Sequence, residues 1–366
     1  MLQKKSIIRR AAFLFAFFLV GIQSVAQVDS SANSLKVTGY AEVYYAYDLS
    51  QPATHLRPAF LYSYNRHNEV NLNLGFIKFD YRQGNVRAKL ALMAGTYAQY
   101  NLASEHPLFQ HIFEATVGTR ISKQHNLWVD AGIMPSHIGF ESAVGKTCWT
   151  LSRSILADNS PYYLSGIRIG YTGKTEKLYL AGLIVNGWQR IKRIPYNQTP
   201  AFGTQLNYKP TGNLTLNWST FAGNEFPDTL KKWRYFNNFY GIFNLTEKFG
   251  LITGFDIGLQ QRSKHSNEYN VWYTPIVIAR ISPYKKVDVA VRAEYFNDPE
   301  QVVIQTFSAG GFQTMGYSVN FDYTIRDNCL WRIEGRIFNS HDSIFLQNTQ
   351  PAHKNYAFYS SFGVTF

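Results

Sequence analysis

The sequence predicts an all-β protein, a closed antiparallel transmembrane β-barrel of about sixteen strands. Three observations lead to this fold class. Segments of about ten residues alternate apolar and polar side chains, the connections between them alternate short and long, and aromatic residues lie near the segment ends. A barrel strand turns only one side chain in two toward lipid, so its mean hydropathy stays low while an apolar outer surface is still built.

The alternation is clearest at 287–295. One face carries Val287, Val289, Val291, Ala293 and Tyr295, and the other carries Asp288, Ala290, Arg292 and Glu294. A helix would place Asp288 and Arg292 in the same stripe as Val291, so the pattern favours a strand. Similar segments predict strands at 35–48, 69–81, 86–97, 109–121, 127–134, 162–172, 177–187, 201–209, 214–223, 233–245, 249–260, 270–281, 287–297, 312–324, 329–338 and 355–366. In the second of them the phase slips near Phe76 and Ile77, which indicates a β-bulge or a misplaced strand edge.

The connections fall into two classes. Short ones rich in turn residues lie at 82–85, 173–176, 210–213, 246–248 and 325–328. Long ones alternate with them, at 49–68, 98–108, 135–161, 188–200, 224–232, 261–269, 298–311 and 339–354. Short periplasmic turns and long extracellular loops produce this pattern, with both chain ends on the periplasmic side.

Aromatic residues are expected on the apolar face near strand ends, where rings pack at a membrane interface: Tyr45, Tyr81, Trp128, Tyr171, Tyr208, Trp233 and Tyr295. The last segment alternates up to the terminal Phe366. A terminal aromatic residue of this kind looks like the signature by which outer-membrane barrels reach their insertion machinery.

Residues 1–26 are predicted to be a cleaved signal peptide. Basic residues precede an apolar run at 11–22, and Ser24 and Ala26 place small residues before a cleavage site. The run is too short for a membrane-spanning helix, which needs about 20 apolar residues. Residues 27–366 are then expected to form one outer-membrane β-barrel.

The charge and cysteine content exclude several classes of protein. The formal net charge is +12, of which the predicted signal supplies four, and the basic residues form no long run. This indicates a mild preference for anions and no nucleic-acid partner. Cys148 is expected in an outer loop and Cys329 at the periplasmic rim, a barrel height apart and unpaired.

No motif predicts an enzyme. The sequence GKT at 145–147 resembles part of a phosphate-binding loop, but Gly139 lies one residue too far upstream. There is no Gly-x-Ser-x-Gly motif, and the histidines have no metal-ligand spacing. We therefore expect no enzymatic activity, no cofactor and no metal.

Three motifs resemble the OmpL-like β-barrel porin family of the Gram-negative outer membrane: VDAGIMPSHIGFES at 129–142, LSRSILADNSPYY at 151–163 and RAEYFND at 292–298. The first two are the specific ones, and the resemblance covers most of the mature chain. It implies a porin-like barrel in the bacterial outer membrane whose solute is mostly undefined.

A barrel of sixteen strands encloses a lumen wide enough for water, so function should reside on its inner face. The predicted pore-lining residues are Arg87, Arg120, Arg168, Arg292, Glu294, Arg332, Glu334 and Arg336. The long loop 135–161 either folds into the lumen, as the third outer loop does in general porins, or stays an exposed surface loop. If it folds inward, Glu141, Lys146, Arg153 and Asp158 are the constriction candidates, facing Arg87, Arg120 and Arg168.

The leading function is passive diffusion of small hydrophilic solutes across the outer membrane, with a mild preference for anions. Its partners would be outer-membrane lipid and those solutes, and a homo-oligomer is compatible with the sequence. The alternative is a binding or adhesion barrel that acts through its extracellular loops around a plugged lumen. Conductance in a planar bilayer distinguishes the two. A third class, a secreted soluble β-protein, would need no detergent.

Overall fold

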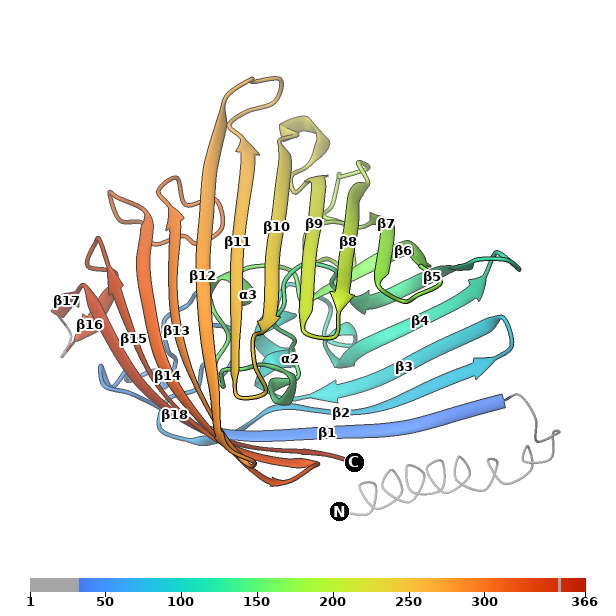
Figure 1. The fold of residues 1–366 in the computed structure, drawn as a ribbon. Coiled ribbons are helices and arrows are strands. Elements are labelled where there is room, and N and C mark those ends of the chain that lie inside the picture. Colours follow the sequence, from blue (N-terminus) through green and yellow to red (C-terminus); the bar gives the residue numbers. More distant parts are fainter. Residues whose placement is uncertain (1–32, 348–349) are drawn as a thin grey trace, which may run out of the picture.

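The computed structural model describes residues 33–347 and 350–366, and the predicted signal peptide lies outside this range. Its main feature is a closed barrel of sixteen antiparallel strands, as the alternation predicts (Figure 1). Within the described residues no helix is long and apolar enough to cross a membrane.

Sixteen strands form the barrel wall: β1 (Asn33–Asp48), β2 (Val70–Gln83), β3 (Val86–Ala94), β4 (Ile112–Arg120), β5 (Asn126–Pro135), β6 (Tyr163–Thr172), β7 (Leu178–Val185), β8 (Ala201–Thr211), β9 (Leu214–Asn224), β10 (Trp233–Asn244), β11 (Phe249–Gln261), β12 (Tyr269–Tyr284), β13 (Val287–Asp298), β14 (Phe312–Arg326), β15 (Cys329–Ser340) and β18 (Lys354–Thr365). The connections hold short elements: α2 (Thr96–Asn101), η2 (Phe109–His111), η3 (Gly145–Thr147), α3 (Ile155–Asp158), η4 (Asp228–Leu230) and the hairpin β16 (Phe345–Gln347) and β17 (Gln350–Ala352).

Antiparallel pairing closes the sheet. Each wall strand pairs with the next one along the chain, and β18 pairs with both β15 and β1. At the seam the backbone N–H of Gly39 donates to the carbonyl of Phe366 over 2.7 Å, and the N–H of Phe366 donates back over 3.0 Å. The ring of Phe366 lies where a Cβ on residue 39 would stand, so a larger residue there would displace the ring. Closure leaves no strand edge unpaired inside a membrane.

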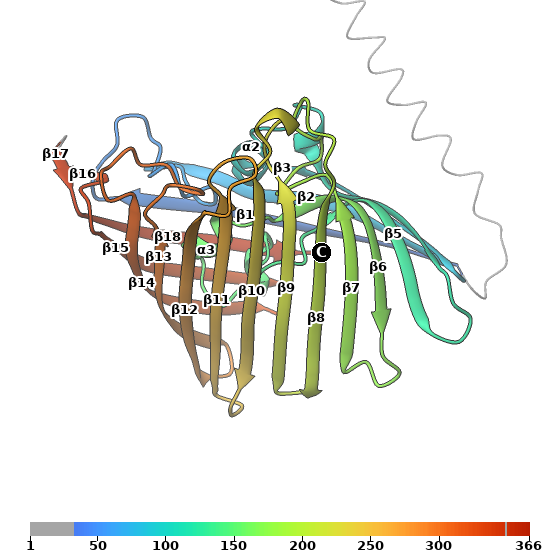
Figure 2. The same cartoon turned by 90° about the horizontal axis from the view of Figure 1, so that it is seen from above.

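The two ends of the barrel differ in their connections. Short turns join the two strands of each hairpin, β2–β3, β4–β5, β6–β7, β8–β9, β10–β11, β12–β13 and β14–β15, whereas the connections between these hairpins are long. Figure 2 shows the turns of β7–β12 at the lower edge and the longer loops at the opposite edge. We call these the turn end and the loop end.

Side chains alternate between the two faces of the wall. On β13, Val291 is 49% exposed on the outer face, whereas Arg292 beside it is 2% exposed on the inner face. Val319 on β14 and Ile337 on β15 repeat the exposed apolar pattern. An apolar outer face and a polar inner face are what a barrel in lipid requires.

The phase slip in β2 is a β-bulge, located three residues before the predicted place. The β1–β2 pairing shifts between Glu42 and Val43, so Asn73 is an extra residue. Its side-chain amide donates to Glu42, and its amide oxygen accepts from the N–H of Tyr64. The bulge thus turns a polar side chain toward the interior.

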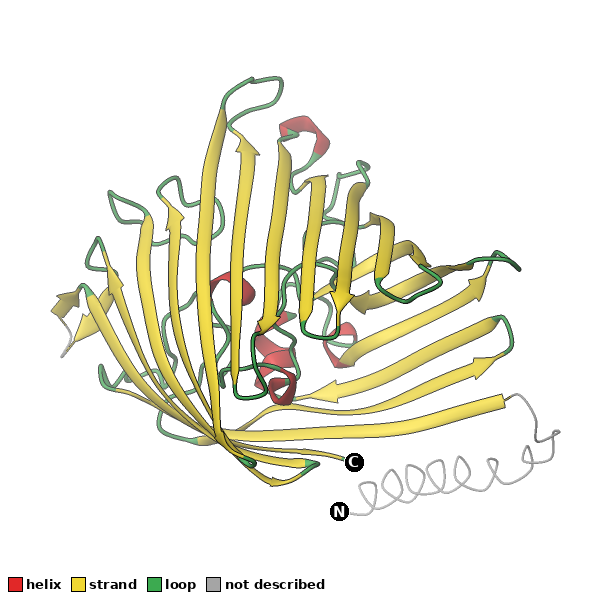
Figure 3. Ribbon diagram, viewed as in Figure 1, coloured by secondary structure: helices red, strands yellow, loops and turns green. Residues whose placement is uncertain are grey.

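Some of the long loops enter the barrel (Figure 3), whereas the β11–β12 loop around Arg262 is exposed. Figure 3 shows the short helices α2 and α3 within the ring of strands. At the loop end Phe60, from the β1–β2 loop, packs edge-on against Phe312 and Phe338 with ring centroids 4.8 and 5.4 Å apart. Buried aromatic residues therefore narrow the interior at this end.

Candidate functional site

Residues 136–162, the connection from β5 to β6, run down the inside of the barrel, and we call them the inserted segment. The N–H of Leu151 donates to Asn320 on β14 over 2.9 Å, and the N–H of Ile155 donates to Glu294 on β13 over 2.6 Å. Lys146 donates to the carbonyl of Asp327 in the β14–β15 turn over 2.5 Å. The segment therefore spans the barrel from the loop end to the turn end.

A buried ion-pair network holds this segment against β13 and β15. Arg292 pairs with Glu334 at 2.8 Å, and Arg336 pairs with Glu294 at 2.7 Å. Glu334 also accepts from the N–H of Ser152 over 2.5 Å. All four charged side chains are essentially unexposed. Such a network satisfies both the buried charges and the backbone groups of the segment.

Arg332 on β15 holds the tip of the inserted segment. Its guanidinium donates to the carbonyls of Gly145, Cys148 and Thr150 at 2.8–3.1 Å. The same side chain forms a bidentate pair with Asp322 on β14. One planar, always charged donor thus binds three carbonyls of the inserted segment.

The charged residues of the inserted segment mostly fold it onto itself. Arg153 donates to the carbonyls of Ser142 and Leu151, both over 2.7 Å. Glu141 accepts from Ser154 at the start of α3. Asp158 accepts from the hydroxyl of Ser63 over 2.9 Å, and its burial raises its pKa to about 7. Burial also raises the pKa of Glu141.

Most of the predicted site residues therefore hold the segment and do not border open water. This group comprises Arg292, Glu294, Arg332, Glu334, Arg336, Glu141, Arg153 and Asp158, all of them buried. The sequence predicted that the loop residues face Arg87, Arg120 and Arg168. In the structure Glu141 binds Ser154, Arg153 binds carbonyls of the segment, Asp158 binds Ser63 and Lys146 binds Asp327. The physical reason is that a loop inside a barrel brings many backbone polar groups out of water, and nearby charges become their partners.

A second group of charges faces the lumen on β2, β3 and β6, where the side chains stay partly exposed. We call Lys78, Arg87, Lys89 and Arg168, on β2, β3 and β6, the basic wall. Arg87 forms a bidentate pair with Asp130 at 2.6–2.7 Å, and Arg168 reaches the same carboxylate at 3.2 Å. The Arg87 and Arg168 side chains are 29% and 25% exposed, whereas Asp130 is 5% exposed.

The two lysines of the basic wall repeat this arrangement. Both pair with Glu114 on β4, Lys89 at 3.5 Å and Lys78 at hydrogen-bonding distance. The lysine side chains are again partly exposed, 23% for Lys78 and 32% for Lys89, while Glu114 is 4% exposed. Arg120 lies apart from them, at the β4–β5 turn, where it donates to the carbonyl of His125.

Sequence reasoning missed Lys78 and misplaced Trp128. Lys78 follows the bulge in β2, which hid the phase of that strand. The apolar side chains of Ile77, Phe79 and Tyr81 on the outer face were the signal that could have placed Lys78 on the inner face. Trp128, predicted on the lipid face, is buried in the interior with the guanidinium of Arg87 4.2 Å from its ring. It shares the phase of the inward Asp130, two residues along β5.

The two cysteines are free, but the reason predicted for this is wrong. Cys148 is not a barrel height away from Cys329, because the inserted segment carries it down into the barrel. Its carbonyl accepts from Arg332, three residues along β15 from Cys329. Both cysteines are buried, and burial raises the pKa of Cys148, so its reactive thiolate is disfavoured.

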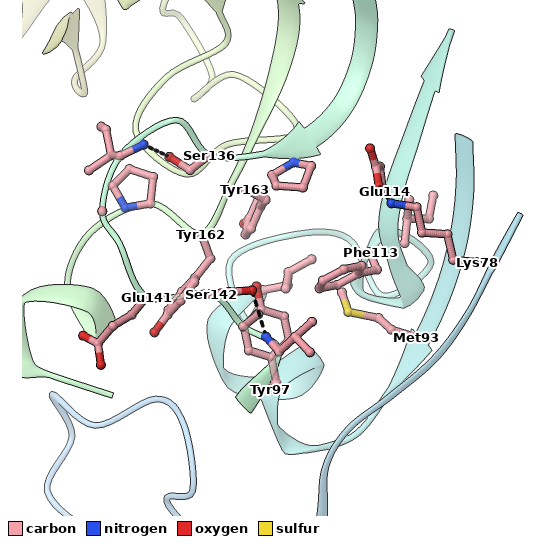
Figure 4. Close-up of a pocket in the computed structure, with 18 of the residues that line it drawn as sticks. Lys78, Met93, Tyr97, Phe113, Glu114, Ser136, Glu141, Ser142, Tyr162 and Tyr163 are labelled. Carbon is pink, nitrogen blue, oxygen red and sulfur yellow. Dashed lines mark hydrogen bonds and ion pairs between the residues drawn. The ribbon is translucent and has the colours of Figure 1, made fainter. Parts of the chain in front are cut away.

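A cavity of about 240 Å³ lies between the inserted segment and the wall formed by β2, β3 and β4. Figure 4 shows Tyr162 and Tyr163 of the segment region on one side, with Phe113, Met93 and Lys78 from the wall on the other. Among the described residues, no group of three or more His, Cys, Asp or Glu is arranged to hold a metal ion.

Comparison with known proteins agrees with this architecture. The family described as "Putative beta-barrel porin-2, OmpL-like" matches residues 34–366. No curated protein matches the chain.

Several solved structures are similar over nearly their whole length. An anion-selective porin from Comamonas acidovorans has 9% identity and a TM-score of 0.60, covering 91% of this chain and 100% of that one. OmpT of Vibrio cholerae has 6% identity and a TM-score of 0.60, covering 93% and 99%. The outer-membrane channel DcaP of Acinetobacter baumannii has 10% identity and a TM-score of 0.59, covering 93% and 100%. At these identities the likeness shows the fold alone.

Proposed function

Since the chain belongs to the OmpL-like β-barrel porin family and is a porin of the bacterial outer membrane, we propose that it lets small hydrophilic solutes diffuse passively, with a mild preference for anions. The path runs along the basic wall, through the part of the lumen that the inserted segment leaves uncovered. The protein then needs no cofactor and carries out no enzymatic turnover.

The observation that carries this proposal is the unequal exposure of paired charges. On the basic wall Glu114 and Asp130 are 4% and 5% exposed, whereas the cations around them are 23–32% exposed. A third carboxylate, Asp80, lies 3.9 Å from Lys89 and is 40% exposed. Around Glu114 and Asp130 a solute in the lumen therefore meets ammonium and guanidinium groups first, with the carboxylates behind them. Partial neutralisation weakens the positive field without reversing it, which favours a mild preference for anions over a strict one. An anion-selective porin also occurs among the structural neighbours.

The test is the ion selectivity of channels reconstituted in a planar bilayer. In a KCl gradient the reversal potential should show chloride more permeant than potassium, and Arg168→Gln should reduce that preference. Arg87 still pairs with Asp130 in this variant, so no buried carboxylate is left alone. The shift should shrink at ~1 M salt, where the Debye length is only about 3 Å.

Arg262→Gln is the matched control, because Arg262 lies in the exposed β11–β12 loop, and it should leave the reversal potential unchanged. Equal selectivity of Arg168→Gln and the unaltered protein would contradict the proposed path. A folded barrel without conductance would instead support the alternative, a binding barrel that acts through its outer loops. A homo-oligomer stays a prediction; one neighbour, OmpT of Vibrio cholerae, is described in a trimer form.

A further inference from the structure

The cavity between the inserted segment and the wall has an apolar body. Tyr97 on α2 contacts Tyr162 edge-on, with ring centroids 5.6 Å apart, and lies 6.3 Å from Phe113 of β4 in the same orientation. Met93 on β3 adds a flexible apolar side chain to the lining. Three strands, one helix and the inserted segment thus enclose a space lined largely by rings and aliphatic groups (Figure 4).

The volume of the cavity fits a small ring with a substituent. An apolar cavity of ~150 Å³ is large enough to hold benzene. This cavity measures about 240 Å³, which leaves room for one ring and a short polar group. It lies beside the basic wall, since Lys78 belongs to both.

The charged side chains that line the cavity are one cation, Lys78, and two carboxylates, Glu114 and Glu141. Its two carboxylates already have partners: Glu114 accepts from both Lys78 and Lys89, and Glu141 accepts from the backbone and hydroxyl of Ser154. Figure 4 shows the Glu141 carboxylate directed away from Lys78. An ammonium group has three donors, so Lys78 can hold Glu114 and still bind a second oxygen.

We propose that this cavity is a binding subsite for small organic anions, namely carboxylates that carry one aromatic ring. The ring would occupy the space among Tyr97, Phe113 and Tyr162, and the carboxylate would bind Lys78. This inference rests on the proposed function and names the class of solute that the porin holds during passage. A neutral sugar fits less well because it needs many hydrogen-bond partners. An organic cation fits less well because two lysines already share Glu114.

Current block in a planar bilayer tests the subsite, with phenylacetate as the probe. Phenylacetate should reduce the chloride current of the unaltered channel in a saturable manner. Acetate has the charge without the ring, and benzyl alcohol has the ring without the charge, so both should block only at much higher concentration. Lys78→Gln should raise the half-blocking concentration of phenylacetate by about tenfold, because a charge-assisted hydrogen bond is lost. Lys78→Arg should restore most of the block.

Two further variants separate binding from general effects of charge and folding. Met93→Trp should fill the cavity and abolish the block without changing any charge. Lys36→Gln removes a lysine that does not line the cavity, and its half-blocking concentration should equal that of the unaltered channel. Heat-modifiable migration on gels verifies that each variant folds.

Failure of the subsite and failure of the proposed porin function give different results. Channels that conduct normally but are blocked no better by phenylacetate than by acetate would overturn the subsite and leave the porin function intact. An unchanged block in both Lys78→Gln and Met93→Trp would also overturn it. A barrel that never conducts would overturn the proposed function, and the subsite with it.

Discussion

The inner wall of this barrel has two regions with similar residues and different roles. On β13 and β15, alternating Arg and Glu side chains such as Arg292 and Glu334 are fully buried under the inserted segment. On β3 and β6, Arg87 and Arg168 pair with a carboxylate in the same way but remain about one quarter exposed. The difference is whether another part of the chain lies against the wall.

This comparison shows that an inward charge in a barrel can be buried against another part of the chain or remain partly exposed in the lumen. Under the segment, the charges replace water as partners for backbone groups, as Glu334 does for the N–H of Ser152. On the basic wall the side chains stay partly exposed, and we propose that water and solutes take that place. Mutations in the two regions should therefore change different measured quantities, stability in the first and selectivity in the second.

The largest expected effect is on stability in the covered region. Glu334→Ala should lower the free energy of unfolding by about 3–5 kcal/mol, because it leaves Arg292 as a buried charge without its closest partner. Thermal unfolding in detergent measures the change, and limited proteolysis should show the inserted segment becoming cleavable.

An exposed ion pair of the same protein provides the control for Glu334→Ala. Glu268→Ala removes a carboxylate from an exposed pair with Arg262, and such pairs contribute at most about 1 kcal/mol. Equal melting temperatures for the Glu334 and Glu268 variants would show that the buried network does not hold the segment.

A smaller effect is expected from pH, through Asp158 of the inserted segment. Its pKa of about 7 lies above the ordinary value of 3.8, because burial disfavours the charged carboxylate. Between about pH 4 and pH 7 the folded protein keeps a proton that the unfolded chain has lost, so stability falls as the pH rises through this window.

Asp158→Asn should remove this loss while keeping an acceptor for Ser63. The variant should melt at a higher temperature than the unaltered protein, and this difference should be several degrees larger at pH 8 than at pH 5. A difference that is equal at the two pH values would mean that the Asp158 carboxylate is not buried as described.

Much of the fold could be predicted from the sequence, because period-two alternation depends on local chemistry. Lipid outside and polar groups inside impose it on every strand, so the sixteen strands and the two classes of connection are confirmed. The errors occur where local signals conflict. An extra residue at Asn73 hid the phase of β2, and the aromatic character of Trp128 suggested lipid although its neighbour Asp130 faces inward.

The site was less predictable, because the role of an inner charge depends on long-range packing. Nothing near Arg292 in the sequence indicates that Ser152 would lie against it, 140 residues away. The placement of Cys148 beside the turn end has the same origin, since loop length alone does not show where a loop goes. Apart from Lys78 and Trp128, alternation identified which of these residues point inward but not which of them meet water.

Thiol labelling during single-channel recording tests the central comparison most directly. Two channels are compared, both with Cys148 and Cys329 replaced by serine. The first carries Lys89→Cys on the basic wall, and the second carries Ser318→Cys under the inserted segment. A charged, membrane-impermeant methanethiosulfonate reagent should then lower the current stepwise in the first channel and leave the second unchanged. Equal modification of both positions, or modification of residue 318 alone, would contradict the division of the lumen into a covered wall and an open basic wall.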